Sequence, residues 1–405
     1  LLILLFVFSS CLGNPQITYD TSKSVKDWGN VMFDDSITSH TVIDQMGFGW
    51  NLGNTFDAHD SNAGLNQGLN SETSWGNQRT TEAMIDALVR KGFKTIRIPV
   101  TWHNHLIDQR YTIDPAWMKR VKEVVDWCLK KGLWVILNIH HDNSNGGVWY
   151  GQGYYPNRNG QAESEKFLAN VWTQICEAFN KGYNQKLIFE ALNEPRLVGN
   201  QYEWWYLPGA SDCEEGNQVL IEYNQLILNV IRKTGGNNAK RFIMFTGQAA
   251  SFSYISGNNF ALPNDSQYNP YNKRILVSVH MYSPYDFAMD SRSGVTFCND
   301  RCKSELMNYF VTLHDKFVAK GYGVVIGELG AINKWNVAQR VDWAKYYVEN
   351  ARKKGLACVV WDNQNWGNGG VEDETFGLFH RSQGTFDPDE LVTAYIQAAK
   401  TTLGY

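Results

Sequence analysis

Two glutamates stand where two strongly apolar stretches of the chain end. Glu194 closes the run KLIFEALNE (186–194), and Glu328 lies near the end of GVVIGELG (323–330). A carboxyl group in such surroundings needs a specific partner, because burying a lone charge is costly. Two carboxyl groups that meet in one pocket can divide a reaction between them. One protonates a leaving oxygen and the other attacks or activates water, which is the chemistry of glycoside hydrolysis.

Eight apolar runs alternate with amphipathic stretches and predict the frame that positions these groups. The runs suit strands buried on both faces of a parallel sheet; they span 47–53, 94–100, 133–141, 186–194, 241–247, 274–282, 323–330 and 357–362. Helices are predicted at 80–91, 115–131, 161–180, 216–234, 303–320 and 336–354. This order predicts an α/β fold, a (β/α)8 TIM barrel in one domain with loop insertions at its C-terminal face. A doubly wound open sheet is the alternative, but no glycine fingerprint opens a helix.

Glycines are expected to end several of these helices. A glycine just past a helix end readily takes the left-handed conformation that completes a C-cap. Each of the candidates follows a lysine; they are Gly92, Gly132, Gly182, Gly321 and Gly355. The polar segment 16–40 precedes the first run and is expected to pack on the outside of the barrel.

Polar side chains gather at the ends of the predicted strands. In a β/α barrel the reactive groups lie where the strands end in their C-terminal loops, so these residues are the candidates for a site. They are Asn51, Asn54, Arg97, His140, His141, Asn193, Glu194, Gln248, His280, Tyr282, Glu328, Trp361 and Asp362. Two carboxylates stand out in this set, Glu194 on the fourth run and Glu328 on the seventh, with imidazoles and an arginine on other runs.

Composition and charge exclude several classes of protein. The chain of 405 residues is 43% apolar and 19% charged, so it can bury a large core. Its net charge is −4, and no clustered basic face indicates a nucleic-acid partner. The chain also holds 15 Trp, 20 Tyr and 20 Phe, and their flat rings suit the apolar faces of sugars as well as a core.

The beginning of the chain is typical of an export signal. Residues 1–8, LLILLFVF, are followed by small residues, which predicts a signal peptide over 1–15, truncated at its start, and a catalytic domain over 16–405. Eight apolar residues are too few to span a bilayer, so no membrane anchor is expected. Of the remaining cysteines, Cys298 and Cys302 are predicted to form a local disulfide, and Cys358 to be a buried thiol.

Seven motifs in order resemble glycoside hydrolase family five, a cellulase-rich family of barrel enzymes. The resemblance covers about residues 44–395, and its GWNLGNTFDA opening is similar to the branch with endoglucanases, lichenases and xyloglucanases. The motifs are GWNLGNTFDA (49–58), IRIPVTW (96–102), VILNIHHD (135–142), LIFEALNEP (187–195), VSVHMYSP (277–284), VIGELG (325–330) and VVWDNQ (359–364).

The resemblance implies a role for each candidate. Glu194 would be the acid/base and Glu328 the nucleophile of a retaining reaction, with carboxyl groups about 5–5.5 Å apart. Their mutual repulsion would raise one pKa and keep an acid protonated near neutral pH. The remaining residues would hold the carboxylates or bind substrate: Arg97 and Tyr282 beside Glu328, Asn193 on the 2-hydroxyl, His140 and His280 as orienting groups, Trp361 as the floor under the sugar, and Asn51 and His141 as further site residues.

Several candidate residues also have a structural interpretation. Glu194 precedes Pro195 and could be a helix N-terminal charge, and His141 could be a core histidine. Glu190 shares the strand parity of Glu194 and is expected to be a buried partner of Arg97. Alternation along a strand would point His140 and His141 apart, which disfavours a metal site there; neither HExxH nor GxSxG occurs.

Loop aromatics extend the expected cleft. Trp149-Tyr150 and Trp204-Trp205-Tyr206 lie in long insertions, and at least one of these rings is expected to line the cleft. Trp102, Trp335 and Trp366 lie in or near loops of the same face, where some rings serve packing.

The function predicted from the sequence is a secreted, extracellular retaining endo-β-1,4-glucanase of the cellulase type. Xyloglucanase, lichenase and mannanase share the mechanism and differ in loop shape, so they remain alternatives. A non-catalytic carbohydrate-binding barrel is the alternative from another class, and the complete glutamate pair disfavours it. The expected partner is a polysaccharide, bound by a monomer without a cofactor, a nucleic acid or a membrane.

Overall fold

The computed structural model describes residues 22, 24–27, 29–60, 64–143, 153–270 and 273–404. The predicted signal peptide, 1–15, and the aromatic pair Trp149-Tyr150 lie outside these residues. Among the helices that are described, none combines the length and the apolar character needed to cross a membrane.

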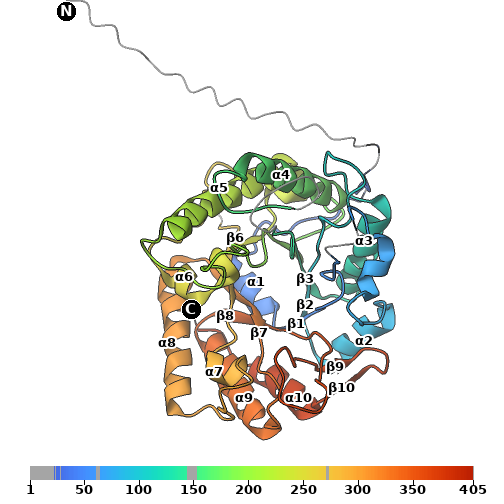
Figure 1. The fold of residues 1–405 in the computed structure, drawn as a ribbon. Helices are drawn as coiled ribbons and strands as arrows, with labels where there is room; N and C mark the ends of the chain where they lie inside the picture. The colour runs from blue at the N-terminus through green and yellow to red at the C-terminus, as the bar shows by residue number, and fades with distance from the viewer. Residues whose placement is uncertain are drawn as a thin grey trace, which may run out of the picture.

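Eight parallel strands close into a barrel in chain order, as predicted (Figure 1). Every strand is buried along its whole length, which explains why the sequence runs are nearly continuous in apolar residues. The strands are β1 (Phe48–Asn51), β2 (Thr95–Ile98), β3 (Trp134–Asn138), β4 (Leu187–Glu190), β5 (Ile243–Phe245), β6 (Ile275–His280), β7 (Gly323–Leu329) and β8 (Leu356–Val360).

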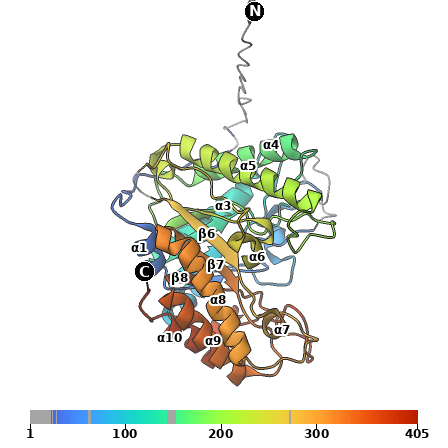
Figure 2. The same cartoon turned by 90° about the vertical axis from the view of Figure 1, so that its left-hand side faces the viewer.

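Helices surround the barrel, and the six predicted ones are present with shifted ends (Figures 1 and 2). Between β5 and β6 the connecting α-helix has only five residues. After β8 a two-stranded antiparallel ribbon of β9 (Phe379–His380) and β10 (Thr385–Phe386) precedes the last helix. The helices are α1 (Ser39–Gln45), α2 (Glu82–Lys91), α3 (Pro115–Lys130), α4 (Gln161–Ala178), α5 (Ser211–Lys233), α6 (Phe252–Ser256), α7 (Tyr285–Ala288), α8 (Asp300–Lys316), α9 (Val337–Lys353) and α10 (Asp389–Ala398).

Most of the predicted helix-ending glycines adopt the left-handed conformation. Gly92 has φ 115° directly after α2, and its amide bonds back to Leu88. At the start of that helix the Thr81 hydroxyl accepts from the amide of Met84, a typical N-cap. Gly132, Gly321 and Gly355 also have positive φ.

Gly182 is an exception, and its prediction as a helix end was wrong. Helix α4 ends at Ala178, and Gly182 lies four residues farther along. Its amide donates to the Asp27 carboxylate at 2.6 Å, and a β-carbon at this glycine would lie 2.6 Å from the same carboxylate. The close approach therefore ties the segment around Asp27 to the outside of the barrel, where the lead-in was expected.

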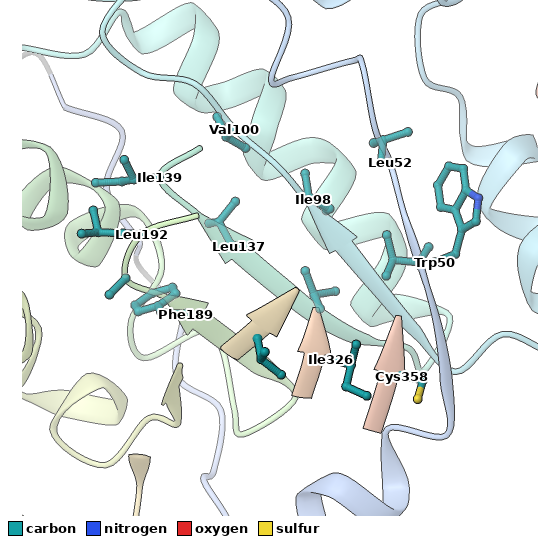
Figure 3. Packing of buried hydrophobic residues seen from close by; sticks show 14 of the residues in the cluster. Trp50, Leu52, Ile98, Val100, Leu137, Ile139, Phe189, Leu192, Ile326 and Cys358 are labelled. Carbon is teal, nitrogen blue, oxygen red and sulfur yellow. The ribbon is translucent and has the colours of Figure 1, made fainter. Parts of the chain in front are cut away.

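The strand residues alternate between two apolar clusters. Outward-facing residues such as Ile98, Leu137 and Phe189 pack under the surrounding helices (Figure 3). Inward-facing Ile136 and Ile188 belong to a second cluster inside the barrel, together with Ile43 of α1. Helix α1 therefore closes the N-terminal end of the barrel. Apolar packing at that end leaves the C-terminal end free for polar groups.

The cysteine predictions are confirmed. Cys298 and Cys302 form a disulfide with Cα atoms 5.2 Å apart at the start of α8. Cys358 is a buried free thiol that packs among the outward-facing residues of the barrel.

Candidate active site

A cavity of about 670 Å³ opens at the C-terminal ends of the strands. Its lining includes eight of the ten residues predicted for the site: His140, His141, Asn193, Glu194, His280, Tyr282, Glu328 and Trp361. The topology explains the gathering, because parallel strands of one barrel all deliver their last residues to the same rim.

The other two predicted residues, Asn51 and Arg97, lie beneath the cavity. Neither has exposed surface, so neither meets the cavity itself. The Asn51 amide donates to the backbone oxygens of Gly327 and Val360 and accepts from Arg97 at 2.9 Å. Both side chains point into the barrel and are covered by the residues above them. They therefore position the groups that line the cavity.

Arg97 contacts residues that line the cavity as well as residues buried beneath it. One terminal nitrogen donates to Glu328 at 2.7 Å, and the other donates to the Asn193 side-chain oxygen at 2.6 Å. Its Nε donates to Glu190 at 2.7 Å. A guanidinium presents its donors in a fixed fork, so these bonds fix the directions of their partners. The predicted contacts of Arg97 with Glu190 and Glu328 are thus present.

Glu190 is sealed from solvent. It has no exposed surface, and it accepts from Asn138 at 2.9 Å and from the Ser278 hydroxyl at 2.6 Å, besides Arg97. Such a buried charge is tolerated only with this many partners. Glu190 is therefore a structural carboxylate, as the strand parity predicted.

Glu328 has the same kind of partners but meets the cavity. It accepts from Arg97 at one oxygen and from the Tyr282 hydroxyl at the other, at 2.8 Å. Burial raises the pKa of Glu328, the positive charges of His280 and Arg97 oppose the rise, and the negative charge of Glu194 adds to it. Arg97 and Tyr282 thus hold both oxygens of Glu328 in a fixed orientation at the cavity wall.

Glu194 is bridged to Glu328 by an imidazole. The His280 Nδ1 lies 2.7 Å from Glu194 and 3.7 Å from Glu328. One atom from each of the three residues can be chosen so that all lie within 4.8 Å of one another. Two carboxyl groups this close can act on the same bond.

The protonation of this group differs from the simple expectation of two repelling carboxylates. Burial raises the pKa of Glu194, but the hydrogen bond and charge of His280 outweigh it, so that the pKa is lowered. Burial lowers the pKa of His280, yet Glu328 and Glu194 raise it above its ordinary value. Both shifts favour the imidazole over Glu194 as the holder of the proton between them.

Trp361 and His140 form one wall of the cavity. Their rings are parallel within 1°, with centroids 6.1 Å apart, and Trp361 is 7% exposed. His140 is held from below, because its Nδ1 lies 3.1 Å from the Asn138 amide. The indole is therefore fixed at the cavity surface, where a sugar ring can stack.

His140 and His141 approach each other instead of pointing apart. Their ring centroids are 4.3 Å apart, so the argument from strand alternation was wrong. Strand β3 ends at Asn138, and alternation does not extend beyond it. With Asp57 these imidazoles form a cluster whose ligand atoms lie within 4.8 Å, as do those of Glu194, His280 and Glu328. In both places the side chains could hold a metal ion.

Asn54, a candidate from the sequence, also lines the cavity, and residues that the sequence did not single out complete it. These residues come from connecting loops and from helices α6, α7 and α8; they are Trp75, Ala249, Ser251, Phe252, Ser253, Ser283, Tyr285, Met289, Tyr309, Asn363, Asn365 and Glu374. Glu374 has φ 60°, and burial followed by the charges of Glu328 and Glu194 raises its pKa to about 7. A left-handed glutamate is uncommon, and no periodic pattern in the sequence indicates it.

Loop aromatics divide into cleft and packing residues. Trp204 lines the cavity with 56% of its surface exposed, and the Arg196 guanidinium lies 4.1 Å from its ring centre. The expectation that a ring of this insertion lines the cleft is confirmed. Trp102 is fully buried and serves packing.

Two proteins similar to this chain are named endoglucanases. Endoglucanase A of Clostridium longisporum is 45% identical over 348 residues, which are 84% of this chain and 62% of the relative. The chain thus spans less than two thirds of that protein. Endoglucanase B of Clostridium cellulovorans is 38% identical over 99% of this chain and 83% of its own length.

Solved structures share the fold and carry sugars. A family 5 lichenase mutant from Caldicellulosiruptor sp. F32, in complex with cellotetraose, is 38% identical with a TM-score of 0.83, covering 92% of this chain and 98% of that chain. A broad-specificity endoglucanase from Ruminococcus champanellensis with bound cellotriose is 38% identical with a TM-score of 0.81, covering 90% of this chain and 100% of that one. The family model of the cellulases matches residues 56–367, and the chain therefore belongs to the cellulase family, glycosyl hydrolase family 5, and is a glycoside hydrolase.

Proposed function

We propose that this protein is a secreted endo-β-1,4-glucanase that hydrolyses β-glucan with retention of anomeric configuration. The observation that carries the proposal is the meeting of Glu194, His280 and Glu328 within 4.8 Å at one cavity wall. Retaining glycosidases hold their carboxyl groups about 5–5.5 Å apart, whereas inverting ones leave about 6.5–9.5 Å for a water molecule. The short separation favours direct attack.

In the first step a Glu328 oxygen attacks the anomeric carbon and forms a glycosyl ester. The bond to the leaving oxygen breaks with its electron pair, and Glu194 supplies the proton that this oxygen takes. Arg97 and Tyr282 oppose the rise in the pKa of Glu328 and hold its carboxylate in place, because each donates to a different oxygen. Asn193 offers its amide to the 2-hydroxyl, since Arg97 already occupies its side-chain oxygen.

His280 stores the proton for this step. The imidazole is hydrogen-bonded to Glu194. Its raised pKa lets it hold its charge at a higher pH than an ordinary histidine does. When Glu328 loses its negative charge in the ester, the imidazolium loses a stabilising partner. The proton then shifts along the hydrogen bond toward Glu194, which delivers it to the leaving oxygen.

In the second step Glu194, now ionised, takes a proton from water. The water oxygen attacks the anomeric carbon, and the ester bond to Glu328 breaks with its electrons returning to the carboxylate. Two displacements restore the original configuration.

The open cleft and its aromatic rings favour an endo-acting enzyme on a glucan. Trp204, Trp75 and Tyr285 lie at the rim around Trp361 and offer stacking surfaces on several sides. Related proteins of the family are named endoglucanases, and one is a lichenase, which makes mixed-linkage glucan a second candidate substrate. The sequence of residues 1–15 and the disulfide Cys298–Cys302 support export.

Product analysis tests the mechanism and the substrate together. The protein is incubated with carboxymethyl-cellulose, mixed-linkage glucan, xyloglucan and mannan, and the anomer formed first is identified by proton NMR. We expect β-products, a rapid fall in viscosity and little early monosaccharide on the first two. Initial α-products would refute retention, and sole cleavage of mannan would refute the substrate. Binding without cleavage of any polymer would favour the non-catalytic alternative.

Export is tested on the mature protein. If residues 1–15 are a signal peptide, N-terminal sequencing of protein recovered from the culture medium of its host should begin near residue 16. Retention of LLILLFVF in a cell-bound protein would contradict export by this route.

A further inference from the structure

A second concavity, of about 280 Å³, lies outside the cleft, beside helices α9 and α10 at the lower edge of Figure 1. It is formed by the connection between β7 and α9, the first turns of α9, and the segment that joins β8 to α10. Its lining is Asn333, Trp335, Val337, Arg340, Trp366, Thr375, Gly377, Asp387 and Pro388. No residue of this lining also lines the active-site cavity.

Arg340 brings an unpaired charge to this concavity. The residue is 3% exposed, and within the described part of the chain its guanidinium makes no hydrogen bond or ion pair, with Nε fully enclosed. Buried charges in proteins are normally paired. Asp387 is near enough to favour the charge, but its carboxylate lies 3.6 Å from His380 and makes no ion pair with Arg340.

Trp335 is held outward at the mouth of the same concavity. It is 67% exposed and has φ 59°, an unfavourable backbone conformation for a bulky residue. The neighbouring Lys334 fixes the turn, because its side chain is buried while that of Trp335 is exposed. The Lys334 ammonium donates to the backbone oxygens of Asp286 and Val295 at 2.6 and 3.1 Å. The structure thus maintains a strained turn that presents an indole to solvent.

Trp366 forms a second aromatic surface, and this one is rigid. Its indole nitrogen donates to the backbone oxygen of Asp387 at 3.1 Å, and its ring stacks on His380 with centroids 4.0 Å apart and an interplanar angle of 11°. An aromatic ring that cannot rotate loses little entropy when a flat apolar ligand face packs on it. The concavity therefore combines one fixed ring, one exposed ring and one unpaired guanidinium.

We infer that this concavity binds a hexuronic acid residue of a polysaccharide, with its carboxylate on Arg340 and its ring against Trp335 and Trp366. The charge selects a carboxylate, because arginine binds this group with two parallel hydrogen bonds. The rings select a pyranose, which has an apolar face. The volume is near the lower limit for ligand pockets and suits one sugar ring. The inference does not depend on the proposed reaction in the cleft.

Ligand-observed NMR on the intact protein tests the inference. Saturation-transfer titrations compare methyl β-glucuronide with methyl β-glucoside, which differs in lacking the carboxylate. The glucuronide should bind at least about tenfold more tightly, the effect of a charge-assisted hydrogen bond. Excess cellotetraose, which should occupy the cleft, should not displace it.

Variants locate the binding. Trp335→Ala should weaken glucuronide binding about tenfold while hydrolysis of soluble glucan stays unchanged, because the exposed ring touches neither catalytic carboxylate. Trp205→Ala is the matched control: its ring is 57% exposed and lines neither cavity, and the variant should bind like the parent. Arg340→Gln should abolish the preference for the glucuronide, with a melting curve to verify folding.

Three results would overturn the inference. They are equal binding of the two glycosides, displacement of the glucuronide by cellotetraose, and equal losses in the Trp335 and Trp205 variants. Because Trp335 is exposed, its variant gives an answer even if Arg340→Gln does not fold.

Discussion

Two carboxylates share the Arg97 guanidinium, and they lie in different surroundings. Glu190 is sealed below the cavity by Arg97, Asn138 and Ser278. Glu328 accepts from Arg97 and Tyr282 and faces the cavity. Each carboxylate thus combines a charged partner with a hydroxyl, at 2.6 Å for Ser278 and 2.8 Å for Tyr282.

The comparison shows that access, more than the type of partner, separates a structural acid from a reactive one. Both carboxylates accept hydrogen bonds from similar donors, so their partners alone do not distinguish them. Only Glu328 has open space above it and a second carboxyl group, Glu194, across that space. Substitutions of Glu190 should therefore affect stability, and substitutions of Glu328 should affect turnover.

The largest effect is expected from Glu328→Gln. The amide cannot form the ester, so kcat on soluble glucan should fall by at least about 10³-fold. The melting temperature should stay close to that of the parent, because the amide still accepts from Arg97. Near-normal turnover would show that Glu328 is not the reactive carboxylate.

Glu190→Gln should show the reverse pattern. The amide nitrogen replaces one carboxylate oxygen in a sealed site, so a donor among Arg97, Asn138 and Ser278 loses its acceptor and the counter-charge of Arg97 is removed. Breaking a buried pair costs about 3–5 kcal/mol. Urea unfolding should reveal the loss in the free energy of unfolding. A variant as stable as the parent with turnover abolished would assign Glu190 a chemical role instead.

The two hydroxyls provide a matched and smaller test. Tyr282→Phe and Ser278→Ala each remove one hydrogen bond to a carboxylate, worth about 1.5–3 kcal/mol. The first should lower kcat by about 10- to 100-fold with little loss of stability. The second should lower the free energy of unfolding and leave kcat within a few-fold. Similar profiles for the two variants would erase the distinction between the two carboxylates.

Glu374→Gln should have the smallest effect, on pH dependence. The pKa of Glu374 is raised to about 7 by burial and by Glu328 and Glu194, so its ionisation opposes theirs. Removing the charge should shift the acidic limb of the kcat/KM profile to lower pH by a fraction of a unit. A shift of the acidic limb to higher pH would contradict this prediction.

The same residue affects stability with a definite sign. Because the folded pKa lies above the ordinary value of 4.5, the folded state binds more protons between about pH 4.5 and 7. Stability contributed by the protonated form is present below this window and is lost as the pH rises through it. In Glu374→Gln that loss should be smaller, as thermal unfolding at several pH values can measure.

Much of the site could be predicted because strand ends are readable from the sequence. Buried parallel strands leave continuous apolar runs, and the barrel fixes where their last residues meet. That reasoning found Glu194, Glu328 and their neighbours, and it paired Glu190 with Arg97. It failed to separate residues inside the cavity from those beneath it, as with Asn51.

The remainder of the cavity depends on loop conformations that no period encodes. Glu374 reaches the site through a left-handed backbone, and Trp75 and Asn363 reach it from long connections. His141 joins His140 because β3 ends earlier than the apolar run does. Gly182 follows lysine like the true helix ends, but it is used for a close contact with Asp27. In each case tertiary contacts, and not local sequence, decide the conformation.

The central claim is that Glu328 forms a covalent bond to the sugar. It is tested most directly with a 2-fluoro cellobioside that carries a good leaving group. The fluorine slows both steps by destabilising the positively charged transition state, and the leaving group restores the first, so the ester accumulates. Mass spectrometry of the digested protein should place one added fluorocellobiosyl group on the peptide that contains Glu328. An active protein that acquires no label, or that carries it on Glu190 or Glu194, would contradict the account.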